Sequence, residues 1–161
     1  MKKVIKCGQF FDSNTGKVLK DIAVVIDGNK ITEVAPAADV CCKDAEVIDL
    51  SGKFVMPGLI DAHVHINMNG EASMQYAVTS DATAAINSMI YAQRDLMAGF
   101  TTLRDEGAQG YSDVAVRDAI NAGKIVGPRI SCSGEAIGGT GGHADSHFLP
   151  CVTGKHAFGQ I

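Results

Sequence analysis

Apolar and polar residues alternate over short stretches in the first 55 positions, which is typical of β-strands. The stretches with this pattern are Val4–Phe11, Ile22–Ile26, Ile31–Val34 and Ala45–Leu50. Asp27-Gly28-Asn29-Lys30 joins the second stretch to the third, and Gly28 and Asn29 tolerate a positive φ, so we expect a tight hairpin there. Ser51-Gly52-Lys53 predicts a turn. These short strands predict a small β-sandwich or a meander.

The pattern changes after Pro57-Gly58, where apolar strands alternate with helical spacing. Residues 81–98 predict a helix with Asp81 as its N-cap and Gly99 as the residue that ends it. A second helix is expected from Ser112, as its cap, through Asn121, with Gly123 behind it. The predicted strands around these helices are Leu59–Ile66, Phe100–Leu103 and Arg129–Ser133. The order β-α-β-α-β predicts an α/β fold with a parallel sheet.

Two histidines separated by a single residue, His63 and His65, lie at the end of the first of these strands. Because alternate residues of a strand share a face, we expect Asp61 to lie on the same face as both imidazoles. Two imidazole nitrogens at the C-terminal end of a strand can bind one divalent metal ion. The other interpretation is a pair of polar residues on a solvated strand face, since H-x-H also occurs by chance. The pair alone leaves both interpretations open.

The surrounding residues resemble the amidohydrolase superfamily, in which P-G-x-[IL]-D-x-H-x-H marks the first barrel strand. Residues 57–65 match that motif, and residues 98–105 resemble the second strand of the family. Gly127–Ile130 resembles the third strand of the family, and Thr140-Gly141-Gly142-His143 resembles the loop that follows that strand. This set resembles the branch that holds Xaa-Pro dipeptidases, Xaa-Arg/Lys dipeptidases and imidazolonepropionase-like enzymes. The resemblance covers nearly the whole chain.

The resemblance implies two domains. Residues 1–55 would be the N-terminal part of a β-sandwich, and residues 56–161 would open a (β/α)8 TIM-like barrel. A complete barrel needs about 250 residues, so residues 56–161 can supply only about three of its βα units. The bridging lysine, the further histidines and the catalytic aspartate of the family would lie beyond Ile161. No residue of this chain is therefore assigned as catalytic.

The same resemblance implies the chemistry. The reaction would be metal-dependent hydrolysis of an amide or peptide C–N bond, with a metal-activated water and a dipeptide or N-acyl amino acid as substrate. His63 and His65 would bind one of one or two divalent ions, most often zinc, and His143 would contact the substrate. Imidazole pairs also accept iron, manganese or nickel.

A chain with three barrel strands leaves a sheet edge unpaired. We therefore expect it to be active only with the remaining C-terminal polypeptide, and to pair with that polypeptide or with a second copy in a homo-oligomer. A non-catalytic fragment or interaction module is the alternative. A nucleotide-binding module is a weaker one: Gly139–Ala144 fits G-x-G-x-x-[GA], but the next residues start a helix poorly and no acidic residue follows about 20 positions on.

Composition adds limits to these functions. Hydrophobic residues make up 46% and charged residues 20% of the chain, as in ordinary globular proteins. The net charge of -4 argues against nucleic-acid and anionic-membrane partners, and no apolar run could span a bilayer. Five cysteines without C-x-x-C argue against a disulfide framework and indicate the cytoplasm. We expect Cys132 to be a small core residue, and Asp105 to cap the loop after its strand.

Overall fold

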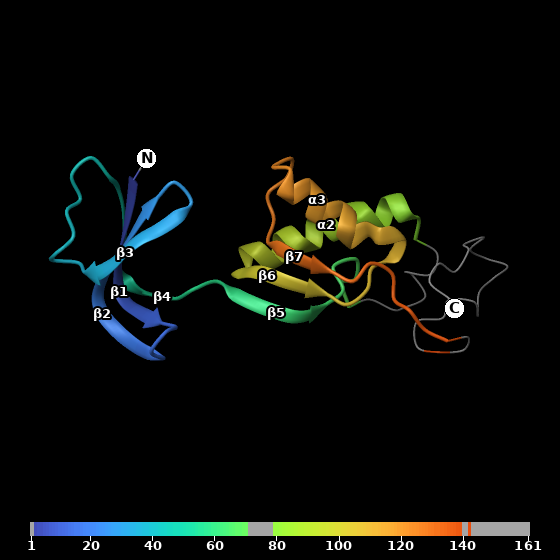
Figure 1. Ribbon diagram of the computed structural model, residues 1–161, viewed down its shortest axis with the longest axis horizontal. Helices are drawn as coiled ribbons and strands as arrows, with labels where there is room; N and C mark the ends of the chain where they lie inside the picture. Colours follow the sequence, from blue (N-terminus) through green and yellow to red (C-terminus); the bar gives the residue numbers. More distant parts are fainter. Residues whose placement is uncertain (1, 71–78, 140–141, 143–161) are drawn as a thin grey trace. The chain divides into compact units, whose positions relative to one another are not determined.

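A computed structural model describes residues 2–70, 79–139 and 142 of the chain. The chain divides into two compact units, Met1–Pro57 and Gly58–Ile161, and each has its own buried core. Figure 1 labels the elements of both units. Within the described ranges, no helix combines the length and the apolar character that a membrane crossing requires.

The first unit is one four-stranded sheet in the order β3-β2-β1-β4. Its strands are β1 Lys2–Asp12, β2 Lys17–Asp27, β3 Lys30–Pro36 and β4 Glu46–Val55. The predicted hairpin is confirmed, because β2 and β3 pair antiparallel up to Asp27 and Lys30, and Gly28 has a φ of +60°. A simple meander is wrong for the whole sheet, because β4 pairs parallel with β1.

The turn predicted at residues 51–53 is also wrong, since β4 continues through it. Leu50 pairs with Cys7 and Phe54 with Gln9, so three residues of β4 lie opposite Gly8 alone. The strand absorbs its turn-forming residues as a bulge. A Cβ atom on Gly8 would lie 1.9 Å from the carbonyl oxygen of Ser51, so only glycine fits at this point of the bulge.

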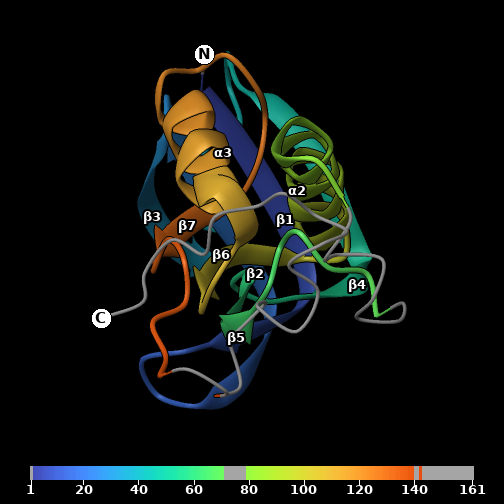
Figure 2. The same ribbon diagram turned by 90° about the vertical axis from the view of Figure 1, so that its right-hand side faces the viewer.

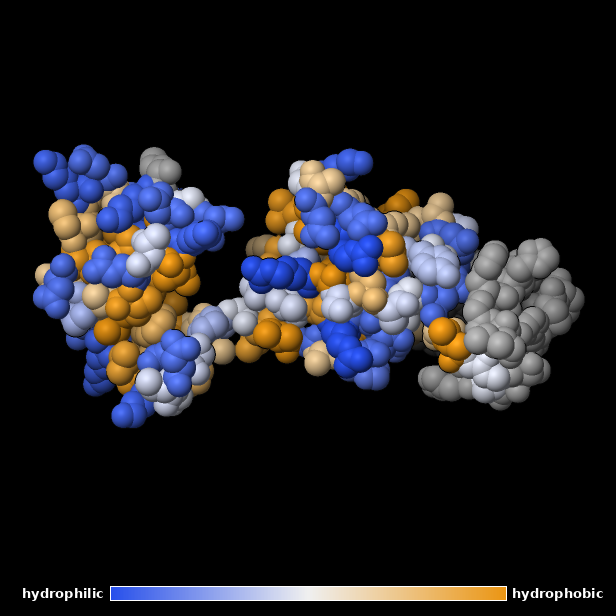
Figure 3. All heavy atoms as spheres, viewed as in Figure 1, coloured by the Kyte–Doolittle hydropathy of each residue, from blue (hydrophilic) through white to orange (hydrophobic). Residues whose placement is uncertain are grey.

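One face of this sheet is covered by a loop of the same unit, and the other face is more exposed. Residues 37–45 cover the first face, where the buried residues Val4, Ala23 and Val25 pack against Ala37, Val40, Cys42 and Ala45. By the strand register, an apolar row crosses all four strands on the second face: Val34, Val24, Ile5 and Ile48. Val34 remains 46% exposed. Apolar side chains are visible on the surface of this unit in Figure 3.

The second unit contains a parallel sheet in the order β5-β6-β7, as the β-α-β-α-β pattern predicts. Its elements are β5 Leu59–Val64, α2 Asp81–Met97, β6 Phe100–Asp105, the short 3-10 helix η1 Gln109–Tyr111, α3 Ser112–Asn121 and β7 Arg129–Cys132. Figures 1 and 2 show α2 and α3 on the same face of the sheet. The core between the two layers consists of Ile66, Ala92, Leu103, Val116 and Ile130.

Helix α2 ends as predicted but begins with a different cap. Ser80, in an extended conformation, is the N-cap, and its hydroxyl accepts a hydrogen bond from the Thr83 N–H. Asp81 lies in the first turn, where it accepts a hydrogen bond of 2.8 Å from the Gln109 side chain. A carboxylate suits the positive end of a helix both at the N-cap and in the first turn. Residue type alone therefore could not show whether Asp81 is the cap or the residue after it. Gly99 follows the last turn with a φ of +102°.

Helix α3 begins at Ser112, but Ser112 is not its cap. Tyr111 is the cap residue, with a left-handed φ of 53° and no side-chain cap bond. The Ser112 hydroxyl is instead buried and accepts a hydrogen bond of 3.1 Å from Ser88 of α2. The serine therefore ties the two helices together. Gly123, with a φ of +68°, follows the end of α3 as predicted.

The cysteines that the structure describes form no disulfide bonds, and their surroundings differ. The described cysteines Cys7, Cys41, Cys42 and Cys132 are all free thiols. Cys132 packs against the core of the second unit, as expected for a small apolar residue. Burial, followed by the nearby charge of Asp113, raises the pKa of the Cys132 thiol to about 12.

The first prediction concerns the bulge. Gly8→Ala should lower the free energy of unfolding by about 1–3 kcal/mol, because the new methyl group meets a backbone oxygen that cannot rotate away. Gly52→Ala is the matched control: its Cβ has open space, so its effect should stay within about 0.5 kcal/mol. Chemical denaturation of both variants measures the difference. Equal stability would contradict the described pairing.

The second prediction concerns thiol reactivity. Iodoacetamide at pH 8 should alkylate the exposed Cys41 in the native protein, but Cys132 only after denaturation, since the thiolate is the reactive form. Mass spectrometry of the labelled peptides separates the sites, and Cys41→Ser serves as the control for assignment. Labelling of native Cys132 at the rate of Cys41 would refute its raised pKa and its packing against the core.

Candidate metal centre at the end of strand β5

Strand β5 begins where the chain passes close to β6. A Cβ atom on Gly58 would lie 2.2 Å from the side chain of Thr101, so glycine allows the chain to enter the sheet beside it. The Leu59 N–H donates a hydrogen bond of 2.8 Å to the carbonyl of Gly99. The Pro-Gly-Leu-Ile sequence thus starts the strand, and His63, four residues after Leu59, lies near its opposite end.

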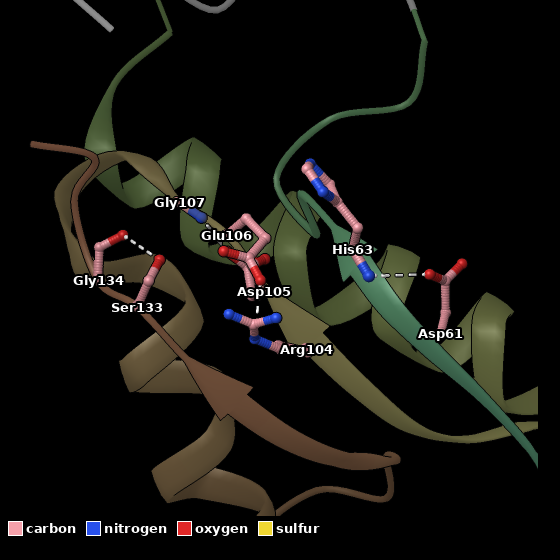
Figure 4. Close-up of polar contacts among 8 residues, drawn as sticks. All are labelled: Asp61, His63, Arg104, Asp105, Glu106, Gly107, Ser133 and Gly134. Atoms are coloured by element: carbon pink, nitrogen blue, oxygen red, sulfur yellow. Dashed lines mark hydrogen bonds and ion pairs between the residues drawn. The ribbon is translucent and has the colours of Figure 1, made fainter. Parts of the chain in front are cut away.

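The pairing of β5 with β6 is irregular beside His63. Asp61 is in register with Leu103, and Val64 with Asp105, so two residues of β5 lie opposite one residue of β6. Inside this bulge the His63 N–H donates a hydrogen bond of 3.1 Å to the Asp61 carboxylate (Figure 4). Simple alternation is therefore interrupted between Asp61 and His63.

The charge of Asp61 is felt by one carboxyl group of helix α2. Asp95 of α2 has a raised pKa, caused first by burial and then by the negative charge of Asp61. The register with the core residue Leu103 agrees with this effect.

His65, half-buried just after the strand, has one ring nitrogen already engaged. Its Nδ1 lies 2.8 Å from the carbonyl oxygen of Gly107. A carbonyl oxygen can only accept, so Nδ1 carries the hydrogen in this contact. In the neutral ring, Nε2 then keeps its lone pair free for a metal ion. A backbone carbonyl in this role is a common way to orient a metal-binding histidine.

His63 is exposed and lies next to His65. The centroids of the two rings are 5.5 Å apart and their planes make an angle of 80°. The part of the chain that the structure describes contains no third His, Cys, Asp or Glu grouped with this pair for a metal ion. Two imidazoles, one with a fixed tautomer, fit a divalent ion as a partial ligand set.

A buried carboxylate lies behind the histidines. Asp105 is 1% exposed, and its two oxygens accept hydrogen bonds of 2.8 Å each from the N–H groups of Ile66 and Gly107. Burial raises the pKa of Asp105, while these two donors act in the opposite direction. The bond to Gly107 confirms the expected loop cap. The bond to Ile66 could not be anticipated, because the two residues are far apart in sequence.

A charged pair lies at the same strand ends. Arg104 and Glu106 form an ion pair of 2.8 Å, visible in Figure 4. The Arg104 side chain is 64% exposed, whereas that of Glu106 is 25% exposed. The Glu106 N–H donates to the carbonyl of Val64, which extends the pairing of β5 and β6 beyond the strands.

The loops after β6 and β7 are joined by bonds that the sequence did not reveal. The fully buried Asp113 accepts a hydrogen bond of 2.9 Å from the Gly134 N–H. The Gly134 carbonyl accepts one of 2.9 Å from Ala108. Glu135 accepts a bond from the N–H of Gly110. His143, the expected substrate contact, and most of the glycine-rich segment lie outside the described residues.

Comparisons with known proteins find relatives over most of this chain. The chain is 31% identical over 140 residues to an ochratoxinase of Aspergillus niger, covering 84% of this chain and 28% of that protein. It is 31% identical over 134 residues to an imidazolonepropionase of Micrococcus luteus, covering 71% of this chain and 33% of the relative. The chain therefore spans about a third of the length of these relatives.

Solved structures resemble the chain as well. A Xaa-Pro dipeptidase with methionine bound in its active site superposes with a TM-score of 0.88 and 33% identity, covering the whole of this chain and 41% of that one. A prolidase complexed with N-methylphosphonate-L-proline gives a TM-score of 0.78 and 38% identity, covering 89% of this chain and 34% of that one. The profile of the Amidohydrolase family matches residues 54–151, more than half of the sequence. The chain belongs to the Amidohydrolase family.

Proposed function

We propose that this chain forms the N-terminal part of a metal-dependent hydrolase that cleaves the C–N bond of a dipeptide or an N-acyl amino acid. The observation that carries the proposal is the pair His63 and His65, in which His65 presents a free Nε2 because Gly107 holds its Nδ1–H. The similarity to dipeptidases, a prolidase and an imidazolonepropionase supports the substrate class.

His63 and His65 would hold a divalent ion, most often zinc, from the end of β5. An ion in this position supplies a Lewis acid for the amide carbonyl. His143 contacts the substrate in this proposal, on the basis of its Thr-Gly-Gly-His motif.

The remaining ligands and the general base would come from the rest of the enzyme polypeptide. Residues 56–161 then form the first three units of a (β/α)8 barrel, and β5 is an edge strand of the described sheet. Ile60 of β5 is 69% exposed and Leu59 is 41% exposed, so this edge offers apolar surface to a further strand or to a second copy in a homo-oligomer.

We further propose that residues 1–55 form half of a β-sandwich. The apolar row on the second face of the first unit supports this, because a solvated face normally carries polar residues at alternate positions. A second sheet laid over this row would bury Val34 and Ile31, which are 46% and 66% exposed in the described sheet. The four cysteines that the structure describes are all free thiols, which is consistent with a cytoplasmic enzyme.

The sandwich leads to the third prediction. In the full-length protein, Val34→Asp should lower the free energy of unfolding by about 3 kcal/mol or more, because a second sheet would bury the new charge without a partner. Glu33→Gln, one residue away on the opposite face and exposed, should change it by less than about 0.5 kcal/mol. If both substitutions are equally harmless in denaturation experiments, the second face is open to solvent.

The fourth prediction tests the activity. Full-length protein with added zinc should hydrolyse members of a panel of dipeptides and N-acyl amino acids. The double variant His63→Ala, His65→Ala should lose bound zinc, measured by atomic emission after dialysis, and should lose hydrolysis with it. The matched control is His147→Ala, a histidine without a metal motif, which should keep both. Equal zinc content in the wild type and the double variant would refute the ligand assignment.

A further inference from the structure

The carbonyl that accepts the hydrogen bond from His65 belongs to the peptide group between Gly107 and Ala108, and this peptide group is fixed by further hydrogen bonds. The carbonyl of Gly107 accepts from His65 at 2.8 Å, while the N–H of the same peptide, on Ala108, donates to Gly134 at 2.9 Å. The preceding N–H, on Gly107 itself, donates to Asp105 at 2.8 Å. The direction of the carbonyl is therefore fixed by bonds to two separate strand ends.

Asp105 connects this peptide to the histidine from the other side. Its second oxygen accepts from the N–H of Ile66, the residue directly after His65, also at 2.8 Å. The Asp105 carboxylate thus binds the backbone at Ile66, next to His65, and the backbone at Gly107, whose carbonyl accepts the hydrogen bond from His65. Asp105 is 1% exposed, so water does not compete for either bond.

Gly107 has the conformation that this arrangement requires. Its φ of +147° is rare for residues with a side chain, and a Cβ atom would lie 3.3 Å from the Cβ of Ala136. A side chain at position 107 would therefore strain the backbone and rotate the carbonyl away from His65. The hydrogen bonds of this segment and the glycine conformation therefore both determine where the carbonyl oxygen of Gly107 lies.

We infer that Asp105 is a positioning residue that sets the tautomer of His65, holding the hydrogen on Nδ1 so that Nε2 faces the metal ion. The inference rests on the proposed metal role of His65. It assigns Asp105 no contact with substrate or metal. Its two hydrogen bonds act through Ile66 and Gly107.

The test uses full-length, metal-free protein labelled with 15N in its histidine rings, at a pH where the rings are neutral. Long-range 1H–15N spectra should show His65 as a single Nδ1–H tautomer in the wild type. Asp105→Asn can accept only one of the two N–H bonds, so His65 should become a mixture of tautomers. Zinc affinity, measured by competition with a chelator, should fall by about 10–100-fold.

Leu103→Ala is the matched control, because Leu103 lies in the same strand, is equally buried and is purely apolar. It should lower the melting temperature without changing the His65 tautomer. If Asp105→Asn does not fold, Gly107→Ala decides, since it should rotate the same carbonyl and give the same tautomer mixture.

Two failures can be told apart. A folded Asp105→Asn protein that keeps the single Nδ1–H tautomer and wild-type zinc affinity would overturn the inference. A wild-type protein that binds no more zinc than the double variant His63→Ala, His65→Ala would overturn the proposed function instead. The tautomer is measured without metal, so it still reports on Asp105 in that case.

Discussion

Parallel pairing between β5 and β6 is the constraint on which the site depends. It places the ends of both strands at one edge of the sheet, so that residues about 40 positions apart become neighbours. The pairing continues beyond the strands through the bond from Glu106 to Val64 and the carboxylate of Asp105. If this register shifted by one residue, His65 would lose its acceptor, and Asp105 would lose its place behind Ile66.

The elements themselves were largely predictable from local patterns. Helix α2 has regular apolar spacing and is followed by Gly99, so its limits followed from the sequence to within one residue, although its cap is Ser80 and not Asp81. The parallel order of β5, β6 and β7 followed from the alternation of strands with helices. The proximity of the two histidine rings was also predictable, because the H-x-H spacing is itself local. Periodicity and chemistry are both local properties of a chain.

The features that were missed are non-local. The bulge opposite Gly8 requires knowledge that β4 pairs with β1, and residues 51–53 read alone favour a turn. The register of β5 against β6 slips between Asp61 and Val64, which no spacing rule reveals. The acceptor of His65 is a backbone oxygen 42 residues away, and any residue type would supply such an oxygen. Contacts of this kind appear only once the strands are paired.

The bond from His65 to the backbone of Gly107 also has a consequence for mutational scanning. A substitution cannot delete a main-chain oxygen, so replacing residues one at a time never removes this acceptor directly. Position 107 would register only as intolerant of side chains, and a scan would classify it as a turn glycine. The group that orients the histidine would thus stay hidden in such a data set, while its supports, such as Asp105, would carry the measurable signal.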